Sequence, residues 1–529
     1  MKLRNNPHFI LAVILLSYAF FLSRYFDLAT VWDAQSNVGL VIEAAKKPFN
    51  LFNLEQSSHP NQAYFLPQSL LQRLDPGNMF YIHSVDVILG ILMIYAFFGI
   101  LRHIAPGKKQ LFEVYVTTIL FAFYPVFSAN VLYTMYDFAL TVYMALTLYF
   151  LLKKRYVLAA LFGVGQMFSK EPGIAIYGIC ITLYFLFYLK NKHSLRKILS
   201  HVPTVIIFLS PYLVLLLYAL YKAFIFKSNV FFATKMPVFL NATSFRSLWP
   251  TWDISKVRTS YMVTIFALNF NWLVTLTTSF GLVRLLWLSV RKKLNSVEID
   301  LKAGLFFLAL FVPVLLILSY VKIFTNPRYF MPSYFLLLVL FFTAIFFIPG
   351  ILIRRAILFG ITALLVISNF ETVDPVSKKI YGTFSYGNHT MLNMTSITGE
   401  CCGYGRDQLV YNLQYVYIDR LTNEIFQFYR ADEDTAFATD KIAGNILSLP
   451  IDKITRRRSW RWEKAFVPKD ISWTFFDPSY PRPDTVYFID YPFVGPTNNL
   501  SYFLTYFQKV GEKIFEMDGY KLPVYTLKH

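Results

Sequence analysis

Long apolar runs recur along the first 370 residues and constrain the fold more than any other feature. A helix of about 20 residues, rising 1.5 Å per residue, crosses a hydrocarbon core of roughly 30 Å. Eleven runs approach this length, at approximately residues 8–26, 81–101, 112–129, 138–152, 156–168, 173–189, 203–224, 261–283, 303–321, 331–350 and 355–370. The sequence therefore predicts a mostly α-helical, polytopic membrane protein with about 11 transmembrane helices.

The composition supports the same class of protein. Hydrophobic residues make up 56% of the 529 residues and charged residues only 15%, which is too apolar for a water-soluble chain of this length. The first run follows Lys2 and Arg4, as a signal peptide would, but it is long, lacks a small-residue cleavage site and precedes many further runs. We expect this run to be a retained helix.

Lysine and arginine collect in alternate loops, and this pattern predicts the orientation, because cytoplasmic loops retain positive charge. The basic side carries Lys2, Arg4, Arg102, Lys108, Lys109, residues 153–155, 190–197 and 291–293, Arg354 and Arg355. The N-terminus is therefore predicted to be cytoplasmic. The loop 27–80, the turns near 137 and 170, the loop 225–260 and the tail from 371 are predicted to be extracytoplasmic. A bacterial plasma membrane and an endoplasmic reticulum membrane both fit this arrangement.

The basic excess belongs to the membrane part. Residues 1–370 hold 32 Lys and Arg against 12 Asp and Glu, whereas residues 371–529 hold 18 against 19. The positive-inside rule explains this excess, so the net charge of +19 gives no support to nucleic-acid binding. Membrane lipids, not nucleic acids, are the expected surroundings.

The chain divides into a predicted transmembrane domain, 1–370, and a soluble α/β domain, 371–529, of ordinary domain size. The alternating segment 484–495 is predicted to be a strand, and helical stretches are expected near 408–430 and 499–516. In the first outer loop, "WDAQSNVGLVIEAAKK" and "QAYFLPQSLLQRL" have apolar residues at helical spacing, and we expect the second to be a short helix in the membrane interface with its Phe, Tyr and Leu facing lipid. No catalytic motif and no metal-ligand spacing of cysteines occurs in the tail.

The fourth and fifth runs are short, and charged residues follow them on the outer side. About 13 apolar residues precede the "SKEP" turn, so a helix there covers only about 20 Å. Lys170, Glu171 and Asp137 should then lie below the outer surface, where charge is tolerated only if protein or water surrounds it. This predicts a recessed polar vestibule. The alternative is a locally thinned bilayer that leaves these turns in interfacial water.

Further polar residues gather on the same side. Asp27 and Asp33 follow the first run, and Arg328 precedes the tenth. His83 and Asp86 are three residues apart and share one helix face. For Asp86 alone, a hydrogen bond between helices is a simpler interpretation than a catalytic role.

The outer loop 225–260 is unusually basic for its predicted side. It contains Arg246, Lys256 and Arg258 with few acids. Such a loop can bind an anionic headgroup or phosphate. It is equally consistent with an ordinary solvated loop.

Together these features resemble the GT-C class of integral-membrane glycosyltransferases, particularly the group of dolichyl-phosphate-mannose protein mannosyltransferases and bacterial aminoarabinose transferases. The resemblance rests on the acidic first outer loop "FDLATVWDAQSN", the acidic residue in "YTMYDFAL", the charged turn "SKEP" and "RYFMP" before a late span. The usual pair of acids in the first loop is absent, since Ala34 follows Asp33. The resemblance covers most of residues 1–350.

The resemblance implies roles for several residues. Asp33, with Asp27 second, corresponds to the general base that activates the acceptor. Asp137 corresponds to a second acidic position, and Lys170 and Arg328 to cations facing a lipid phosphate. Glu171, His83 and the three cations of the loop 225–260 complete the predicted substrate-binding set.

The expected function is transfer of a sugar from a polyprenyl-phosphate-linked donor to a protein, lipid or glycan acceptor on the extracytoplasmic side. No cofactor is indicated, and the sequence leaves open whether a divalent metal takes part, because no His or carboxylate cluster has ligand spacing. The alternative is a polytopic transporter or lipid flippase, which predicts two related halves with interrupted helices. No such halves are evident.

Overall fold

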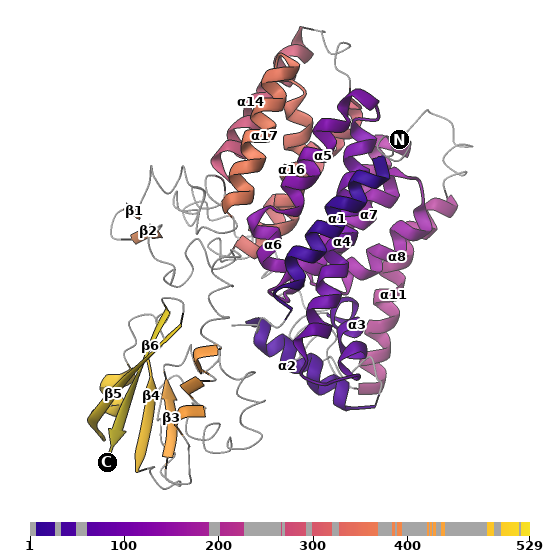
Figure 1. Ribbon diagram of the computed structural model, residues 1–529. Coiled ribbons are helices and arrows are strands. Elements are labelled where there is room, and N and C mark those ends of the chain that lie inside the picture. The colour runs from indigo at the N-terminus through magenta and orange to yellow at the C-terminus, as the bar shows by residue number, and fades with distance from the viewer. Residues whose placement is uncertain are drawn as a thin grey trace.

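The structure is a computed structural model of the whole chain. It describes residues 7–26, 33–48, 61–189, 202–226, 266, 270–291, 299–319, 327–368, 383–386, 389–393, 420–422, 424–425, 427–429, 435–439, 484–490, 499–517 and 520–529. These residues form a large helical bundle and a small sheet, as Figure 1 shows.

A helix occupies each of the eleven predicted runs, wholly or in part. The helices are α1 (Pro7–Ser23), α4 (Met79–Ile104), α5 (Leu111–Ala122) with α6 (Pro125–Val131), α7 (Tyr136–Leu152), α8 (Tyr156–Met167), α9 (Pro172–Tyr184) with η4 (Phe185–Leu189), α11 (Val202–Phe226), α14 (Trp272–Val290), α15 (Leu301–Ser319), α16 (Met331–Ile345) and α17 (Ile351–Ile367). Short 3-10 helices, η3 (Lys108–Gln110) and η8 (Pro327–Phe330), precede α5 and α16.

Six helical segments of the described chain are long and apolar enough to cross a membrane, or seven if a bent pair counts as one span. The bent pair joins residues 108–122 to α6 at an angle of 50°. The helices α1, α7 and α8 are apolar but shorter, and α8 has only 12 residues. A polytopic membrane protein is thus the class indicated, while the number of eleven spans stays a prediction.

The bundle is built around α16, in which every residue from Met331 to Ile345 is buried. This helix packs against α4, α5, α7, α14 and α15. Aromatic rings fill the contacts: Phe335 meets Phe97 and Phe121 edge-on, with ring centroids 5.5 Å apart in both cases. A helix that is apolar all round is typical of such an enclosed position or of a lipid-facing span.

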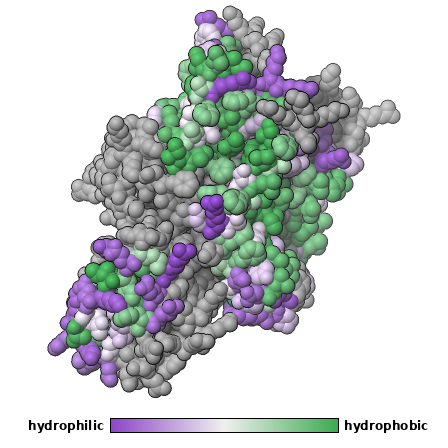
Figure 2. Space-filling model, viewed as in Figure 1, coloured by the Kyte–Doolittle hydropathy of each residue, from purple (hydrophilic) through white to green (hydrophobic). Residues whose placement is uncertain are grey.

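The exposed face of the bundle in Figure 2 is largely hydrophobic, with hydrophilic residues towards its two ends. Basic residues meet at one end. The buried Glu113 carboxylate accepts hydrogen bonds from Arg354, at 3.0 and 3.2 Å, and from Arg355, at 3.1 Å. Arg355 also donates to the carbonyl of Lys109. Loops predicted to be cytoplasmic thus lie together.

Two helices form at the predicted positions in the first outer loop, α2 (Asp33–Lys46) and α3 (Gln62–Gln72). They pack against one another, and α3 also contacts α4, α7 and α8. The buried residues of α3 include Tyr64, Phe65 and Gln68. The expectation that the apolar side chains of α3 face lipid is therefore wrong for Tyr64 and Phe65, which have no exposed surface because they pack into the bundle.

The described tail contains β1 (Thr383–Tyr386) paired with β2 (His389–Asn393), and a four-stranded sheet in the order β3-β4-β6-β5. In this sheet β3 (Thr435–Thr439) runs parallel to β4 (Thr485–Ile489), and β6 (Tyr520–Lys528) is antiparallel to both β4 and β5 (Gln508–Met517). In Figure 1 the sheet lies beside the end of the bundle that carries α2 and α3. The boundary at residue 370 stays a prediction.

One sequence-based expectation for the tail is wrong. The stretch 499–516 is helical only in α22 (Asn499–Phe503), and residues 508–517 form β5. Its partner β6 supplies the reason, because nine register pairs join the two strands and provide hydrogen-bond partners for the backbone on that side of β5. The Asp-Gly pair at 518–519, a strong hairpin signal, was the clue in the sequence.

The basic end of the bundle yields a stability prediction. Glu113→Gln leaves two partly buried arginines without their carboxylate, and breaking a buried ion pair costs about 3–5 kcal/mol. We expect a clear fall in Tm in detergent. The matched control is Glu43→Gln, which removes the exposed pair with Lys46 at 2.7 Å and should cost at most about 1 kcal/mol. Equal shifts for the two variants would contradict the buried role of Glu113.

Candidate active site

Five consecutive residues at the junction of α6 and α7, Tyr133 to Asp137, contact four different parts of the protein. Thr134 has the left-handed backbone angle φ 51°, which is uncommon for a β-branched residue. The chain turns there, and α7 begins two residues later at Tyr136. We call residues 133–137 the hub segment.

The strongest contact of the hub segment is an ion pair. Nζ of Lys170 donates a hydrogen bond of 2.7 Å to Oδ1 of Asp137. Asp137 is 1% exposed and Lys170 is 7% exposed, so the pair is withdrawn from solvent. The other oxygen of Asp137, Oδ2, is buried and has no hydrogen-bond partner among the described residues. A group with further donors could therefore bind there.

Lys170 and a second cation, Arg328, both contact the aromatic ring of Tyr329. Nζ of Lys170 is 4.4 Å from the centroid of the Tyr329 ring, and Cζ of Arg328 is 5.1 Å from it. Arg328 is 1% exposed and also lies 5.7 Å from the ring of Tyr133, in the hub segment. In a cation–π contact the negative face of the ring attracts the cation. The structure thus brings Asp137, Lys170 and Arg328 together.

The "SKEP" turn owes its shape to local contacts. Pro172 is the first residue of α9, where its missing N–H and fixed φ suit a helix start. The amide of Gly173 donates to the carbonyl of Lys170 at 2.9 Å, and the hydroxyl of Ser169 donates to the carbonyl of Gly165 at 2.7 Å. A side chain at position 173 would meet the carbonyl oxygen of Gln166. The turn that carries Lys170 is therefore closely packed.

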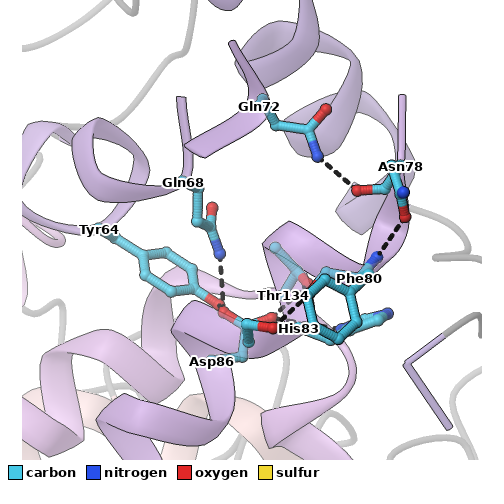
Figure 3. Close-up of polar contacts among 9 residues, drawn as sticks. Tyr64, Gln68, Gln72, Asn78, Phe80, His83, Asp86 and Thr134 are labelled. Carbon is cyan, nitrogen blue, oxygen red and sulfur yellow. Dashed lines mark hydrogen bonds and ion pairs between the residues drawn. The ribbon is translucent and has the colours of Figure 1, made fainter. Parts of the chain in front are cut away.

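Asp86 forms a neighbouring polar cluster, drawn in Figure 3. Its Oδ1 accepts hydrogen bonds from the hydroxyl of Tyr64, at 2.8 Å, and from Nε2 of Gln68, at 2.7 Å. Its Oδ2 accepts from the hydroxyl of Thr134 at 2.9 Å and lies 3.5 Å from Nδ1 of His83. Asp86 is a buried hydrogen-bonded carboxylate, as the sequence suggested.

Tyr64, on α3, remains a neutral donor in this cluster. Burial raises the pKa of its phenol well above the ordinary value, and the adjacent Asp86 carboxylate raises that pKa further. A protonated phenol can donate to a carboxylate, whereas a phenolate would repel it. Tyr64 therefore acts as a hydrogen-bond donor from α3 to Asp86 on α4.

The outer-loop helix α2 also touches the hub segment. The hydroxyl of Tyr136 donates to Oδ1 of Asn37 at 2.7 Å, and Nδ2 of Asn37 lies 3.5 Å from the sulfur of Met135. Asp33 is the first residue of α2, one helical turn before Asn37. The helix that begins at Asp33, the predicted base, thus contacts Tyr136, the residue before Asp137.

The remaining predicted site residues are placed as follows. His83 is buried beside Asp86, and Glu171 is half-buried next to Lys170. Asp27, Arg246, Lys256 and Arg258 lie outside the described residues. Their roles, like those of the other predicted site residues, stay predictions.

Tyr133, Thr134 and Tyr329 are not among the predicted site residues, although each contacts Arg328 or Asp86. Tyr329 directly follows Arg328, so an aromatic residue beside a cation was a weak available signal. Nothing local marks Thr134, because its partner Asp86 is 48 residues away in sequence. No group of three or more His, Cys, Asp or Glu that could hold a metal ion occurs within the described ranges.

The packing of the "SKEP" turn yields a second prediction. Gly173→Ala forces the new methyl group against the Gln166 carbonyl, and relieving such overpacking costs about 1–3 kcal/mol. We expect a lower Tm in detergent. Gly360→Ala is the matched control: it lies in α17 with nothing within 4 Å, so alanine should be neutral or stabilise the helix by up to about 1 kcal/mol. A Gly173→Ala protein as stable as the control would show that the turn has room to adjust.

No protein-family model matches the chain, and no curated protein matches it. Two solved structures are similar to it, those of ArnT from Cupriavidus metallidurans in the apo state and bound to undecaprenyl phosphate. Each is 12% identical with a TM-score of 0.46. The likeness covers 97% of this chain and 97% of the apo chain, and 98% and 97% for the complex. At this level of likeness neither the fold nor the activity of ArnT is transferred to this chain.

Proposed function

We propose that this protein is an integral-membrane glycosyltransferase that moves a sugar from a polyprenyl-phosphate-linked donor to an acceptor on the extracytoplasmic side. The observation that carries the proposal is the pair of buried cations, Lys170 and Arg328, on one aromatic ring beside the carboxylate of Asp137. A lipid-linked phosphodiester is an anion, and two neighbouring cations can attract its phosphate oxygens.

The donor properties of the two cations suit a phosphate. Lysine has three N–H donors, of which Lys170 uses one for Asp137. Arginine presents a planar fork that matches phosphate oxygens. A phosphate held by both would also lie near the protein interior, where its interaction with them is strengthened by the low dielectric.

The proposed step is a displacement at the anomeric carbon of the sugar. The acceptor oxygen forms a bond to this carbon, and the bond from the carbon to the phosphate oxygen breaks. The acceptor proton goes to the carboxylate of Asp33, with Asp27 as the second candidate. Polyprenyl phosphate leaves with one more negative charge than it had in the donor, so the cations stabilise the leaving group more than the ground state.

Several finer assignments belong to the same proposal. His83 and Glu171 would contribute to substrate binding, and Arg246, Lys256 and Arg258 would attract the anionic headgroup. The acceptor is a protein, a lipid or a glycan, and the mannosyltransferase-like and aminoarabinose transferase-like groups remain the nearest models. The proposal does not require a divalent metal.

The first test concerns the cations. Arg328→Gln should lower kcat for sugar transfer by about 10²–10³-fold, because a charge that stabilises the leaving group is lost. Arg328→Lys, which keeps the charge but loses the fork, should retain part of the activity. Transfer is measured by mass spectrometry with synthetic polyprenyl-phosphate sugars and membranes as the source of acceptor.

The matched control is Arg24→Gln, which alters an exposed arginine that stacks on Phe20 at 4.7 Å. It should transfer sugar at the wild-type rate. A wild-type protein that transfers no sugar from any donor, but moves labelled polyprenyl phosphate across liposome membranes, would replace this proposal with the flippase alternative.

The second test concerns the base. Asp33→Asn keeps the shape of the side chain but cannot accept the acceptor proton, so kcat should fall by about 10²–10⁴-fold with little change in donor binding. Glu43→Gln, on the exposed side of the same helix, is the control. If Asp33→Asn and Asp27→Asn both keep full activity, the base lies elsewhere and the mechanism is wrong.

A further inference from the structure

The two oxygens of the Asp86 carboxylate serve different parts of the protein. Oδ1 accepts both bonds from α3, from Tyr64 and Gln68, whereas Oδ2 accepts the bond from Thr134 in the hub segment (Figure 3). Asp86 has no exposed surface. A single carboxylate on α4 thus joins the outer-loop helix α3 to the segment that carries Asp137.

A buried carboxylate at this place needs an explanation. Removing a charge from water is costly, and an apolar side chain would fill the same volume without that cost. Asp86 recovers the cost only through its donors, and all of these come from outside its helix except His83. We therefore interpret the Asp86 carboxylate as a group that serves to hold its hydrogen-bond partners in a fixed geometry.

Thr134 is where that geometry matters. Its left-handed φ of 51° is unfavourable for a branched side chain and persists only where the surroundings enforce it. The hydrogen bond of 2.9 Å from the Thr134 hydroxyl to Oδ2 of Asp86 stabilises this backbone conformation. Asp137, three residues after Thr134, bonds to Lys170, and Tyr133, one residue before Thr134, lies against Arg328.

We propose that Asp86 is a positioning residue for the phosphate-binding groups and acts through the hydroxyl of Thr134. The bond fixes the turn at Thr134, and the turn sets where Asp137 holds the Lys170 ammonium and where Tyr133 supports the Arg328 guanidinium. The inference rests on the proposed function for its effect on substrate, but its effect on the hub segment is independent of substrate.

The test removes the hydroxyl and keeps the shape, with Thr134→Val. Backbone exchange of residues 133–137 is followed by hydrogen–deuterium exchange mass spectrometry, and binding of sugar-free polyprenyl phosphate by native mass spectrometry. Exchange should become faster, and affinity should fall about 10–100-fold, the range for a hydrogen bond to a charged group. Thr134→Ser restores the hydroxyl and should recover most of both losses.

Two further variants separate positioning from a general loss of stability. Thr118→Val is the matched control, because the Thr118 hydroxyl is buried but bonds only to the Val114 carbonyl of its own helix, at 2.7 Å. It should change neither readout. On an Asp137→Asn background, Thr134→Val should weaken binding much less than on the wild-type background, because both changes then act on the same contact.

The outcomes are distinguishable. Unchanged exchange in Thr134→Val, or a Thr134→Ser protein as impaired as Thr134→Val, overturns the positioning role whatever the activity. If exchange becomes faster but the affinity for polyprenyl phosphate is unchanged, the hub segment does not position the phosphate-binding groups. A wild-type protein that binds no polyprenyl phosphate overturns the proposed function instead, and the exchange experiment then decides the structural part by itself.

Discussion

The buried ion pair between Lys170 and Asp137 is the contact on which the arrangement of the site depends. Neither charge is stable alone at such low exposure, since a single uncompensated charge is far more costly than the pair. The pair therefore ties the "SKEP" turn to the start of α7 and fixes both in one geometry. Because Lys170 uses only one of its three donors on Asp137, the same contact that stabilises the turn leaves it able to receive an anion.

The hub segment connects this ion pair to other parts of the protein. Its five residues contact the Arg328 side chain, the Asp86 carboxylate, helix α2 through Asn37 and the Lys170 ammonium. Donor-binding and acceptor-activating groups must be held in one geometry for a transfer reaction, because misplacement by about 1 Å can cost a factor of about 10². A short segment that bonds to the predicted base helix and to the predicted phosphate site is a direct way to hold them.

Much of the fold was predictable because hydrophobic runs dictate helices locally. Each of the eleven runs contains a helix over all or part of its length, and both helices of the first outer loop form where their spacing indicated. The exception is 508–517, where the helical interpretation failed because strand pairing with β6, a contact made outside the segment, decided the structure. Tyr64 and Phe65 were also misassigned to lipid, since their burial depends on the helices that α3 meets and not on its own periodicity.

The sequence by itself indicated that the chain is a polytopic membrane protein and that Asp137, Lys170 and Arg328 flank apolar runs, because hydropathy and charge are properties of single segments. Only the tertiary structure decided that Lys170 pairs with Asp137, that both cations contact the Tyr329 ring and that Asp86 bonds to Thr134. Asp137 and Lys170 are 33 positions apart, and Asp86 and Thr134 are 48 apart, so these contacts depend on how whole helices pack in the bundle. Periodicity within one helix carries no information about that packing.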